Sequence, residues 1–124
     1  MTTQIRPALF RDVSGYVKAS ASEGVAIEDR ADTQWFTIDA DGRPVGCVGL
    51  RRRSARRVSV VGVYVAPFAR GYGVGSAATE QVIALAAPGV TVDAVAYNPK
   101  WYLARGFVVG RTYLHGSLVR REAQ

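Results

Sequence analysis

The chain has 124 residues, of which 48% are hydrophobic, and it carries a formal net charge of +6 at pH 7. This length suits a single domain over residues 1–124. No run approaches the ~18 uninterrupted apolar residues of a membrane span, and Met1 to Asp12 lacks the apolar core of a secretory signal. The one cysteine, Cys47, excludes an internal disulfide framework and a cysteine-rich metal site. We therefore expect a cytoplasmic protein that uses no metal.

The first half of the chain predicts a strand, a helix and then three strands. Asp12 to Ala21 is the expected helix, since its apolar residues share one face, and residues 22–33 are polar and predict a loop. The strands are expected at Thr3 to Leu9, Gln34 to Asp39, Pro44 to Arg51 and Arg57 to Val65. Asp41-Gly42 predicts a hairpin turn. The last of these strands is the strongest, with five valines and a tyrosine.

The second half predicts a long helix, a strand, a short helix and final strands. The long helix covers Gly73 to Ala86 and ends at Pro88-Gly89. Asn98-Pro99 begins the short helix, and Gly106 ends it. Strands are expected at Val90 to Tyr97, Phe107 to Val109 and Thr112 to Val119. Strands linked by hairpins, followed by a strand–helix–strand crossover, are typical of an α+β fold.

Three glycines follow the strongest strand and lead into the long helix. Gly71, Gly73 and Gly75 allow a backbone to approach a ligand without a Cβ between them. The first amides of a helix have no internal partner, and the helix dipole adds positive potential there. Arg70 adds a guanidinium that matches phosphate oxygens. The segment therefore predicts a site for a diphosphate, although a tightly packed turn would use the same glycines.

Two motifs resemble the GNAT superfamily of N-acetyltransferases, and the order of elements is similar across nearly the whole chain. Arg70, Gly73 and Gly75 match its motif A, which directly follows the central strand. Asn98, Tyr102 and the pair Gly106-Phe107 look like its motif B. The resemblance implies a GNAT-like fold: a mixed, mostly antiparallel central sheet flanked by about three helices. It also implies an acyltransferase that moves an acetyl group from acetyl-coenzyme A to an amine of a small molecule or a protein.

The resemblance assigns the cofactor-binding residues. The central strand would offer its backbone to the pantetheine arm, here at Val63 and Val65, and Asn98 would contribute from the short helix. The amides of the loop would hold the pyrophosphate, at Arg70, Gly71, Tyr72, Gly73, Val74, Gly75 and Ser76. The thioester would lie where the central strand and the strand over Val90 to Tyr97 move apart.

Tyr102 is the candidate catalytic acid, because a phenol is protonated at pH 7 and can give a proton to a leaving thiolate. A core aromatic beside Trp101 and Phe107 is the alternative for this residue. The family's glutamate base aligns with Ser59, which leaves the base open. One candidate is a water held by an early-loop carboxylate, Glu23, Glu28 or Asp29, and a solvated surface carboxylate is the alternative for each of the three. The amide of Tyr64 or Val65 is the candidate oxyanion donor. His115, the only histidine, is expected to be structural.

A basic cluster packs five arginines into residues 51–57: Arg51, Arg52, Arg53, Arg56 and Arg57. Eight strand residues place this cluster about 25 Å from the glycine loop. We therefore expect it either to be a solvated hairpin tip or to bind an acidic or nucleic-acid partner. This cluster keeps two other functions open: acylation of a nucleobase or tRNA, and a non-catalytic module that binds coenzyme A or nucleic acid. Many proteins of this fold pair up, so a homodimer is also a candidate assembly.

Overall fold

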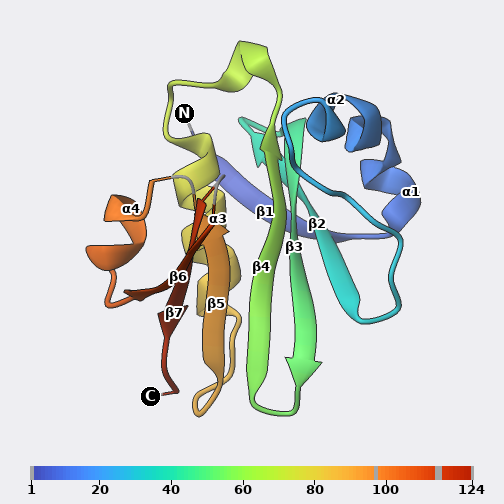
Figure 1. The fold of residues 1–124 in the computed structure, drawn as a ribbon. Coiled ribbons are helices and arrows are strands. Elements are labelled where there is room, and N and C mark those ends of the chain that lie inside the picture. The colour runs from blue at the N-terminus through green and yellow to red at the C-terminus, as the bar shows by residue number, and fades with distance from the viewer. Residues whose placement is uncertain (1, 97, 114–115, 124) are drawn as a thin grey trace.

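A computed structural model describes residues 2–96, 98–113 and 116–123, and seven strands in these ranges form one sheet (Figure 1). The strands are β1 (Thr3–Ala8), β2 (Thr33–Ala40), β3 (Arg43–Ser54), β4 (Arg57–Val65), β5 (Thr91–Ala96), β6 (Val108–Tyr113) and β7 (Gly116–Arg121). Their order in the sheet is β1-β2-β3-β4-β5-β7-β6. Only the β4–β5 pair is parallel among these neighbours. The expected mixed, mostly antiparallel GNAT-like sheet is confirmed.

Helices cover both faces of the sheet. The described helices are α1 (Phe10–Val13), α2 (Val17–Ala21), α3 (Val74–Ala84) and α4 (Lys100–Leu103), with 3₁₀ turns at Ser14–Tyr16 and Pro67–Ala69. Helices α1 and α2 lie on one face, and α3 and α4 lie on the other. Within the described ranges, no helix is long and apolar enough to cross a membrane.

Several predicted boundaries are confirmed and two are wrong. Strand β4 has its predicted bounds, and Asp41 and Gly42 form the predicted turn with φ of 50° and 82°. The helix expected over residues 12–21 is instead split into α1, a 3₁₀ turn and α2. Gly15 has poor helix propensity, and the Ser14 hydroxyl donates to the Arg11 carbonyl at 2.8 Å, which competes with helical pairing.

The other wrong boundary lies near the C-terminus. The predicted strand over residues 112–119 is divided, because β6 continues to Tyr113 and β7 begins at Gly116. Gly110 and Arg111, where the sequence predicted a break, form an irregularity inside β6 between Val109 and Thr112. His115 lies outside the described residues, so its expected structural character stays a prediction.

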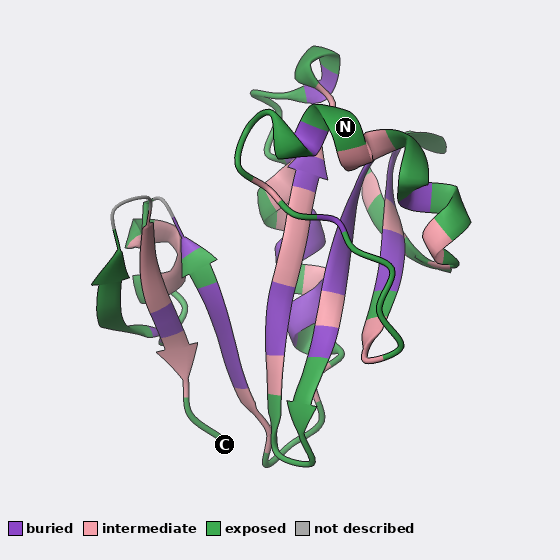
Figure 2. Cartoon of the chain, turned by 45° about the vertical axis from the view of Figure 1, so that its right-hand side comes forward, coloured by how far each residue is buried: buried purple, intermediate pink, exposed green. Residues whose placement is uncertain are grey.

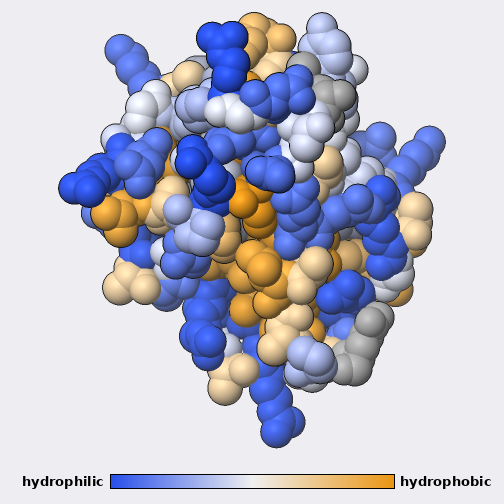
Figure 3. Space-filling model, turned by 180° about the vertical axis from the view of Figure 1, so that it is seen from behind, coloured by the Kyte–Doolittle hydropathy of each residue, from blue (hydrophilic) through white to orange (hydrophobic). Residues whose placement is uncertain are grey.

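Two hydrophobic cores lie on opposite faces of the sheet (Figure 2). The larger core packs α3 against the strands and includes Val74, Ala78 and Val82, all close to fully buried. Seen from the α3 side, hydrophobic residues gather in the middle of the face and hydrophilic side chains surround them (Figure 3). The smaller core packs the α1–α2 region on Trp35 and Cys47. Each face of the sheet therefore has its own hydrophobic core, and β4 contributes residues to both cores.

A bulge in β4 sets which residues face which core. The β3–β4 register shifts between the pairs Cys47–Tyr64 and Gly49–Val61, so β4 carries one extra residue. Gly62 lies in this bulge with φ of +60°, where a side chain is strained. Below the bulge Val60 faces the α3 core, and above it Val63 and Val65 face the same core.

Strands β4 and β5 pair only at their first four residues. Their ladder runs from Arg57–Thr91 to Val60–Ala94 and then stops, although both strands continue. Figure 2 shows β5 diverging from β4 beyond this point. The bulge begins after Val61, one residue beyond the last residue of β4 that pairs with β5.

We expect Gly62→Ala to lower the free energy of unfolding by roughly 2–4 kcal/mol, from backbone strain and overpacking. A Cβ at this position would lie 2.5 Å from Trp35 Cη2, and the backbone has φ of +60°. Gly15→Ala is the matched control, because its new methyl group would have no neighbour within 4 Å. Urea denaturation measures both; equal midpoints for the two variants would contradict this account of the bulge.

Candidate functional site

A cavity of about 910 Å³ occupies the opening between β4 and β5. On the α3–α4 side it is lined by Thr79, Trp101 and Tyr102. On the other side it is lined by the loop after α2, including Val25 and Glu28. Because residues from both faces line one cavity, the opening passes through the sheet.

A smaller hollow of about 400 Å³ lies at the C-terminal end of β4, beside the glycine loop. Gly71 and Gly73 have φ of +87° and +75°, which explains why glycines stand there. The Ala77 amide is the first in α3 to bond back, to the Gly73 carbonyl at 3.0 Å. Among the described residues, no backbone hydrogen bond uses an amide from residues 71 to 76. These amides are therefore available to an anion at the helix start.

The structure brings most of the predicted cofactor-binding residues to this hollow. The predicted residues that line it are Val63, Val65, Arg70, Gly71, Gly73, Val74, Gly75 and Ser76. Tyr72 is 64% exposed and lines neither cavity. Asn98 also lines neither; its Oδ1 accepts from the Lys100 amide at 3.1 Å and so helps to begin α4. The assignments to the cofactor remain predictions.

The Arg70 side chain turns away from the loop amides. Its Nε donates to the Val65 carbonyl at 2.8 Å, and a terminal nitrogen lies 2.8 Å from Glu23 Oε1. The hydrogen bond to Glu23 raises the pKa of Arg70. Because Glu23 already pairs with this guanidinium, the backbone amides and the dipole of α3 are the groups left to attract an anion.

Tyr102 both packs in the core and lines the larger cavity. Its ring meets Trp101 and Phe107 edge to face, with centroids 4.8 Å and 5.1 Å away. Burial raises the pKa of the Tyr102 phenol. The side chain is therefore held in place by aromatic packing and stays protonated at neutral pH, as an acid requires.

The early-loop carboxylates separate in the structure. Glu28 lines the larger cavity, Glu23 is paired with Arg70, and Asp29 lines neither cavity. Of the three candidate positions for holding a basic water, only Glu28 reaches the larger cavity. Among the described residues, no group of three His, Cys, Asp or Glu side chains is arranged as metal ligands.

Sequence reasoning missed a buried polar pair in the cavity, Ser59 and Asp93. They are register neighbours on β4 and β5, and the Ser59 hydroxyl donates to Asp93 Oδ1. Asp93 is only 4% exposed. The sequence signal that could have indicated this pair was Asp93, the single charged residue of the strand predicted at residues 90–97.

The expectation of a solvated hairpin tip is wrong for Arg51, which is buried, whereas Arg52, Arg53, Arg56 and Arg57 are exposed. Arg51, Arg53 and Arg57 line the larger cavity, and Arg51 is only 8% exposed. Arg52 pairs across the sheet with Val58, which packs on the α3 core, so it lies on the opposite face. Strand alternation therefore decides on which face of the sheet the arginines of β3 lie.

Comparisons with known proteins agree with this architecture. The profile of the acetyltransferase (GNAT) family matches residues 6–107, and the chain therefore belongs to this family. A comparison with curated proteins gave no match.

Solved structures share the fold at low sequence identity. Rv2747 from Mycobacterium tuberculosis, in complex with CoA and NLQ, has a TM-score of 0.77 at 14% identity, covering 98% of this chain and 99% of that one. An acyl-CoA N-acyltransferase from Pseudomonas aeruginosa has a TM-score of 0.71 at 19% identity, covering 97% and 99%.

A longer protein also contains this fold. N-acetylglutamate synthase from Neisseria gonorrhoeae, complexed with coenzyme A and N-acetyl-glutamate, has a TM-score of 0.74 at 17% identity. The match covers 100% of this chain but 36% of the synthase chain. This chain therefore spans about a third of that protein.

We expect Gly73→Glu to weaken coenzyme A binding by about 100-fold or more. A carboxylate roughly 4 Å from a phosphate costs about 4 kcal/mol at an effective dielectric of ~20. Gly89→Glu is the matched control, since Gly89 also has positive φ and open space around it but lies beyond the other end of α3. Isothermal titration calorimetry measures both; unchanged affinity in Gly73→Glu would remove the loop from the site.

We expect the Cys47 thiol to resist alkylation in the native protein at pH 8. Burial raises its pKa to about 12, so the reactive thiolate is scarce, and its sulfur contacts the Gly62 carbonyl at 3.5 Å. The urea-unfolded chain should react at the rate of a free thiol. Rapid native labelling, followed by mass spectrometry, would contradict the buried, non-nucleophilic assignment.

Proposed function

We propose that the chain transfers an acyl group, acetyl in the simplest case, from acetyl-coenzyme A to an amine of a small molecule or a protein. The observation that carries this proposal is the opening between β4 and β5, which ends beside the unpaired amides of residues 71–76. Membership of the GNAT family supports the proposal, and so do the two neighbours solved with coenzyme A.

The donor would lie along the upper half of β4. Its pyrophosphate would accept hydrogen bonds from the loop amides, with Gly71 and Gly73 leaving room for close approach. Its pantetheine arm would follow Val63 and Val65, taking the position that a paired strand would otherwise occupy. The thioester would then reach the part of the cavity near Val61 and Tyr102.

In the transfer step, the neutral amine attacks the thioester carbonyl carbon and a C–N bond forms. The carbonyl electron pair becomes an oxyanion and then re-forms the C=O bond as the C–S bond breaks. The amine loses a proton, in this proposal to water near Glu28, and the departing thiolate takes a proton from the Tyr102 phenol. The products are an amide and the free thiol of coenzyme A.

Strand geometry favours Val65 over Tyr64 as the oxyanion donor. The Ala66 amide donates to the Val45 carbonyl, toward β3, at 2.7 Å. Amides alternate between the two edges of a strand, so the Tyr64 amide also points to β3 and the Val65 amide points toward the opening. A preorganised amide at this position would stabilise charge on the carbonyl oxygen.

Acylation of a nucleobase or tRNA has less support than acylation of a smaller acceptor. The five arginines that suggested a polyanion do not form one surface, because Arg51, Arg53 and Arg57 enter the cavity while Arg52 lies on the other face. Binding of acetyl-coenzyme A tests the whole proposal directly: ligand at ~100 times its dissociation constant stabilises a protein by about 2.7 kcal/mol. An unchanged melting temperature at saturating acetyl-coenzyme A would overturn it.

We expect Tyr102→Phe to lower kcat by about 10²- to 10⁴-fold while leaving the affinity for acetyl-coenzyme A nearly unchanged. The variant keeps the aromatic ring and its packing and removes only the hydroxyl group. Because burial raises the pKa of the phenol, its ionisation should not reduce wild-type kcat below about pH 10. Tyr16→Phe, in the smaller core, is the control. A pH profile of kcat measures these effects. If Tyr102→Phe kept the wild-type kcat, a group other than Tyr102 would have to protonate the leaving thiolate.

A further inference from the structure

We propose that the acceptor is a small amine that also carries a carboxylate, and that Arg53 binds this carboxylate. This inference rests on the proposed acyl transfer and specifies its second substrate. The site is the part of the cavity on the α1–α2 face, which we call the arginine basin; it is defined by Arg51, Arg53, Arg57, Arg120, Ser59 and Asp93.

The basin carries more positive than negative charge. Four arginines line the cavity against two carboxylates, Glu28 and Asp93. A recessed site with an excess of one sign concentrates ligands of the opposite sign. The question is then which guanidinium is available to a ligand.

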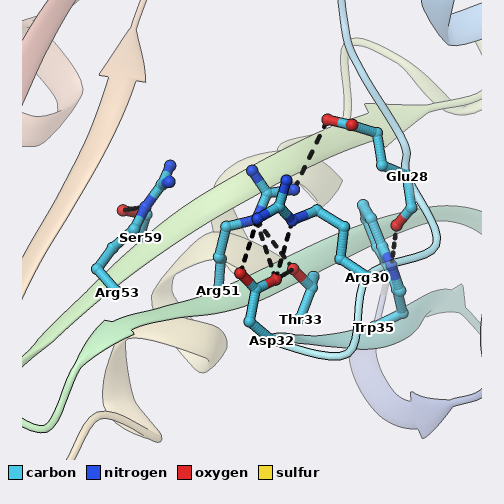
Figure 4. A network of polar contacts seen from close by, with 8 residues as sticks. All are labelled: Glu28, Arg30, Asp32, Thr33, Trp35, Arg51, Arg53 and Ser59. Atoms are coloured by element: carbon cyan, nitrogen blue, oxygen red, sulfur yellow. Dashed lines mark hydrogen bonds and ion pairs between the residues drawn. The ribbon is translucent and has the colours of Figure 1, made fainter.

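Arg51 is not available, because its own neighbours satisfy it. Its Nε donates to Thr33 Oγ1 at 2.9 Å and lies 3.7 Å from Asp32 Oδ1. A terminal nitrogen lies 3.8 Å from Glu28 Oε1. Figure 4 shows this guanidinium enclosed by the loop that precedes β2. Arg51 therefore holds that loop to the sheet.

Arg57 and Arg120 both face Asp93. Arg57 Nε lies 3.0 Å from Asp93 Oδ2, and a terminal nitrogen of Arg120 lies 3.7 Å from the same oxygen. One carboxylate thus serves two arginines on the floor of the basin. Each of these two guanidinium groups thus has a carboxylate partner, but the two share its single negative charge.

Arg53 is the arginine without a carboxylate. Its Nε donates to Ser59 Oγ at 2.9 Å, and since a guanidinium only donates, the Ser59 proton must go to Asp93. Within the described ranges, no ion pair or other side-chain hydrogen bond involves Arg53. Figure 4 shows Arg53 beside Ser59, apart from the Arg51 network. Arg53 is exposed, its Nε is anchored on Ser59, and its two terminal nitrogens are free to bind a carboxylate.

The rest of the cavity suits a small zwitterion better than a polyanion. Val25, Ala26, Val61 and Leu118 provide apolar walls for a carbon skeleton. Glu28, whose side chain is 53% exposed, would attract the ammonium form of an arriving amine, whereas it would repel a chain of phosphates. Arg53 is bonded to Ser59, which lies three residues before Gly62, about 10 Å along the strand. A short molecule bound by Arg53 would therefore reach the opening between β4 and β5.

The test compares amino acids with their carboxamides as acceptors, with acetyl-coenzyme A as donor. The panel is glycine, β-alanine, γ-aminobutyrate and glutamate, each beside its amide, so that charge is removed while the amine stays. Thiol release and mass spectrometry of the product measure kcat/KM. We expect kcat/KM of at least one acid to exceed that of its amide by about 10-fold or more. This ratio corresponds to the ~1.5–3 kcal/mol contributed by a hydrogen bond to a charged group.

Variants then locate the effect. Arg53→Gln should abolish the preference for the acid by raising its KM, and Arg53→Lys should retain part of it, because charge remains but the planar fork is lost. Arg52→Gln is the matched control: it removes the same charge from the next residue of β3, on the other face, and should keep the full preference. Coenzyme A affinity should be the same in all three.

The outcomes separate this inference from the proposed function. If acetyl-coenzyme A does not bind the wild type, the acyltransferase proposal fails first. If acetyl-coenzyme A binds, three results would still overturn the acceptor inference. They are equal kcat/KM for acids and amides, acylation of peptides or tRNA alone, and no reaction with any carboxylate-bearing amine. Equal losses in Arg53→Gln and Arg52→Gln would also overturn it. If Arg53→Gln does not fold, the wild-type ratio of kcat/KM for acid and amide still tests recognition of the carboxylate, and Arg53→Lys still tests the guanidinium.

Discussion

The structure depends on one interrupted ladder, the parallel pairing of β4 and β5 that stops at Val60 and Ala94. A sheet interior normally pairs its backbone groups, because an unpaired buried amide or carbonyl costs free energy. Here the bulge at Gly62 lies just beyond the last pair, and the upper half of β4 keeps one edge without a strand. The cavity, the candidate oxyanion donor and the approach to the glycine loop all follow from this interruption.

The same interruption explains how a chain of 124 residues holds a large cavity without losing its core. The larger core under α3 and the smaller core around Trp35 are closed independently, on opposite faces. Neither depends on side chains filling the space between β4 and β5. Some polar groups that line that space satisfy one another, as Ser59 and Asp93 do. Asp93 Oδ2, Trp101 Nε1 and Arg120 Nε are buried there without a hydrogen-bond partner among the described residues.

Local patterns allowed much of the fold to be predicted. The valines of β4, the Asp41-Gly42 turn and the glycines at the start of α3 each act within a few residues, and the structure agrees at all three. The cavity floor could not be predicted this way, because Asp93 and Ser59 meet across strands that are 34 residues apart in sequence. The positions of the arginines depend on how side chains alternate between the two faces of β3. Arg53 lines the cavity, whereas its neighbour Arg52 lies on the other face of the sheet.

An opening that penetrates the sheet also has a kinetic consequence. Residues of α3 and α4 border it on one face, and the loop after α2 borders it on the other. If donor and acceptor enter it from opposite sides, as the proposed function requires, neither has to leave before the other arrives. Such a transfer would need no covalent relay through the protein's side chains, and the only thiol of the sequence, Cys47, is buried.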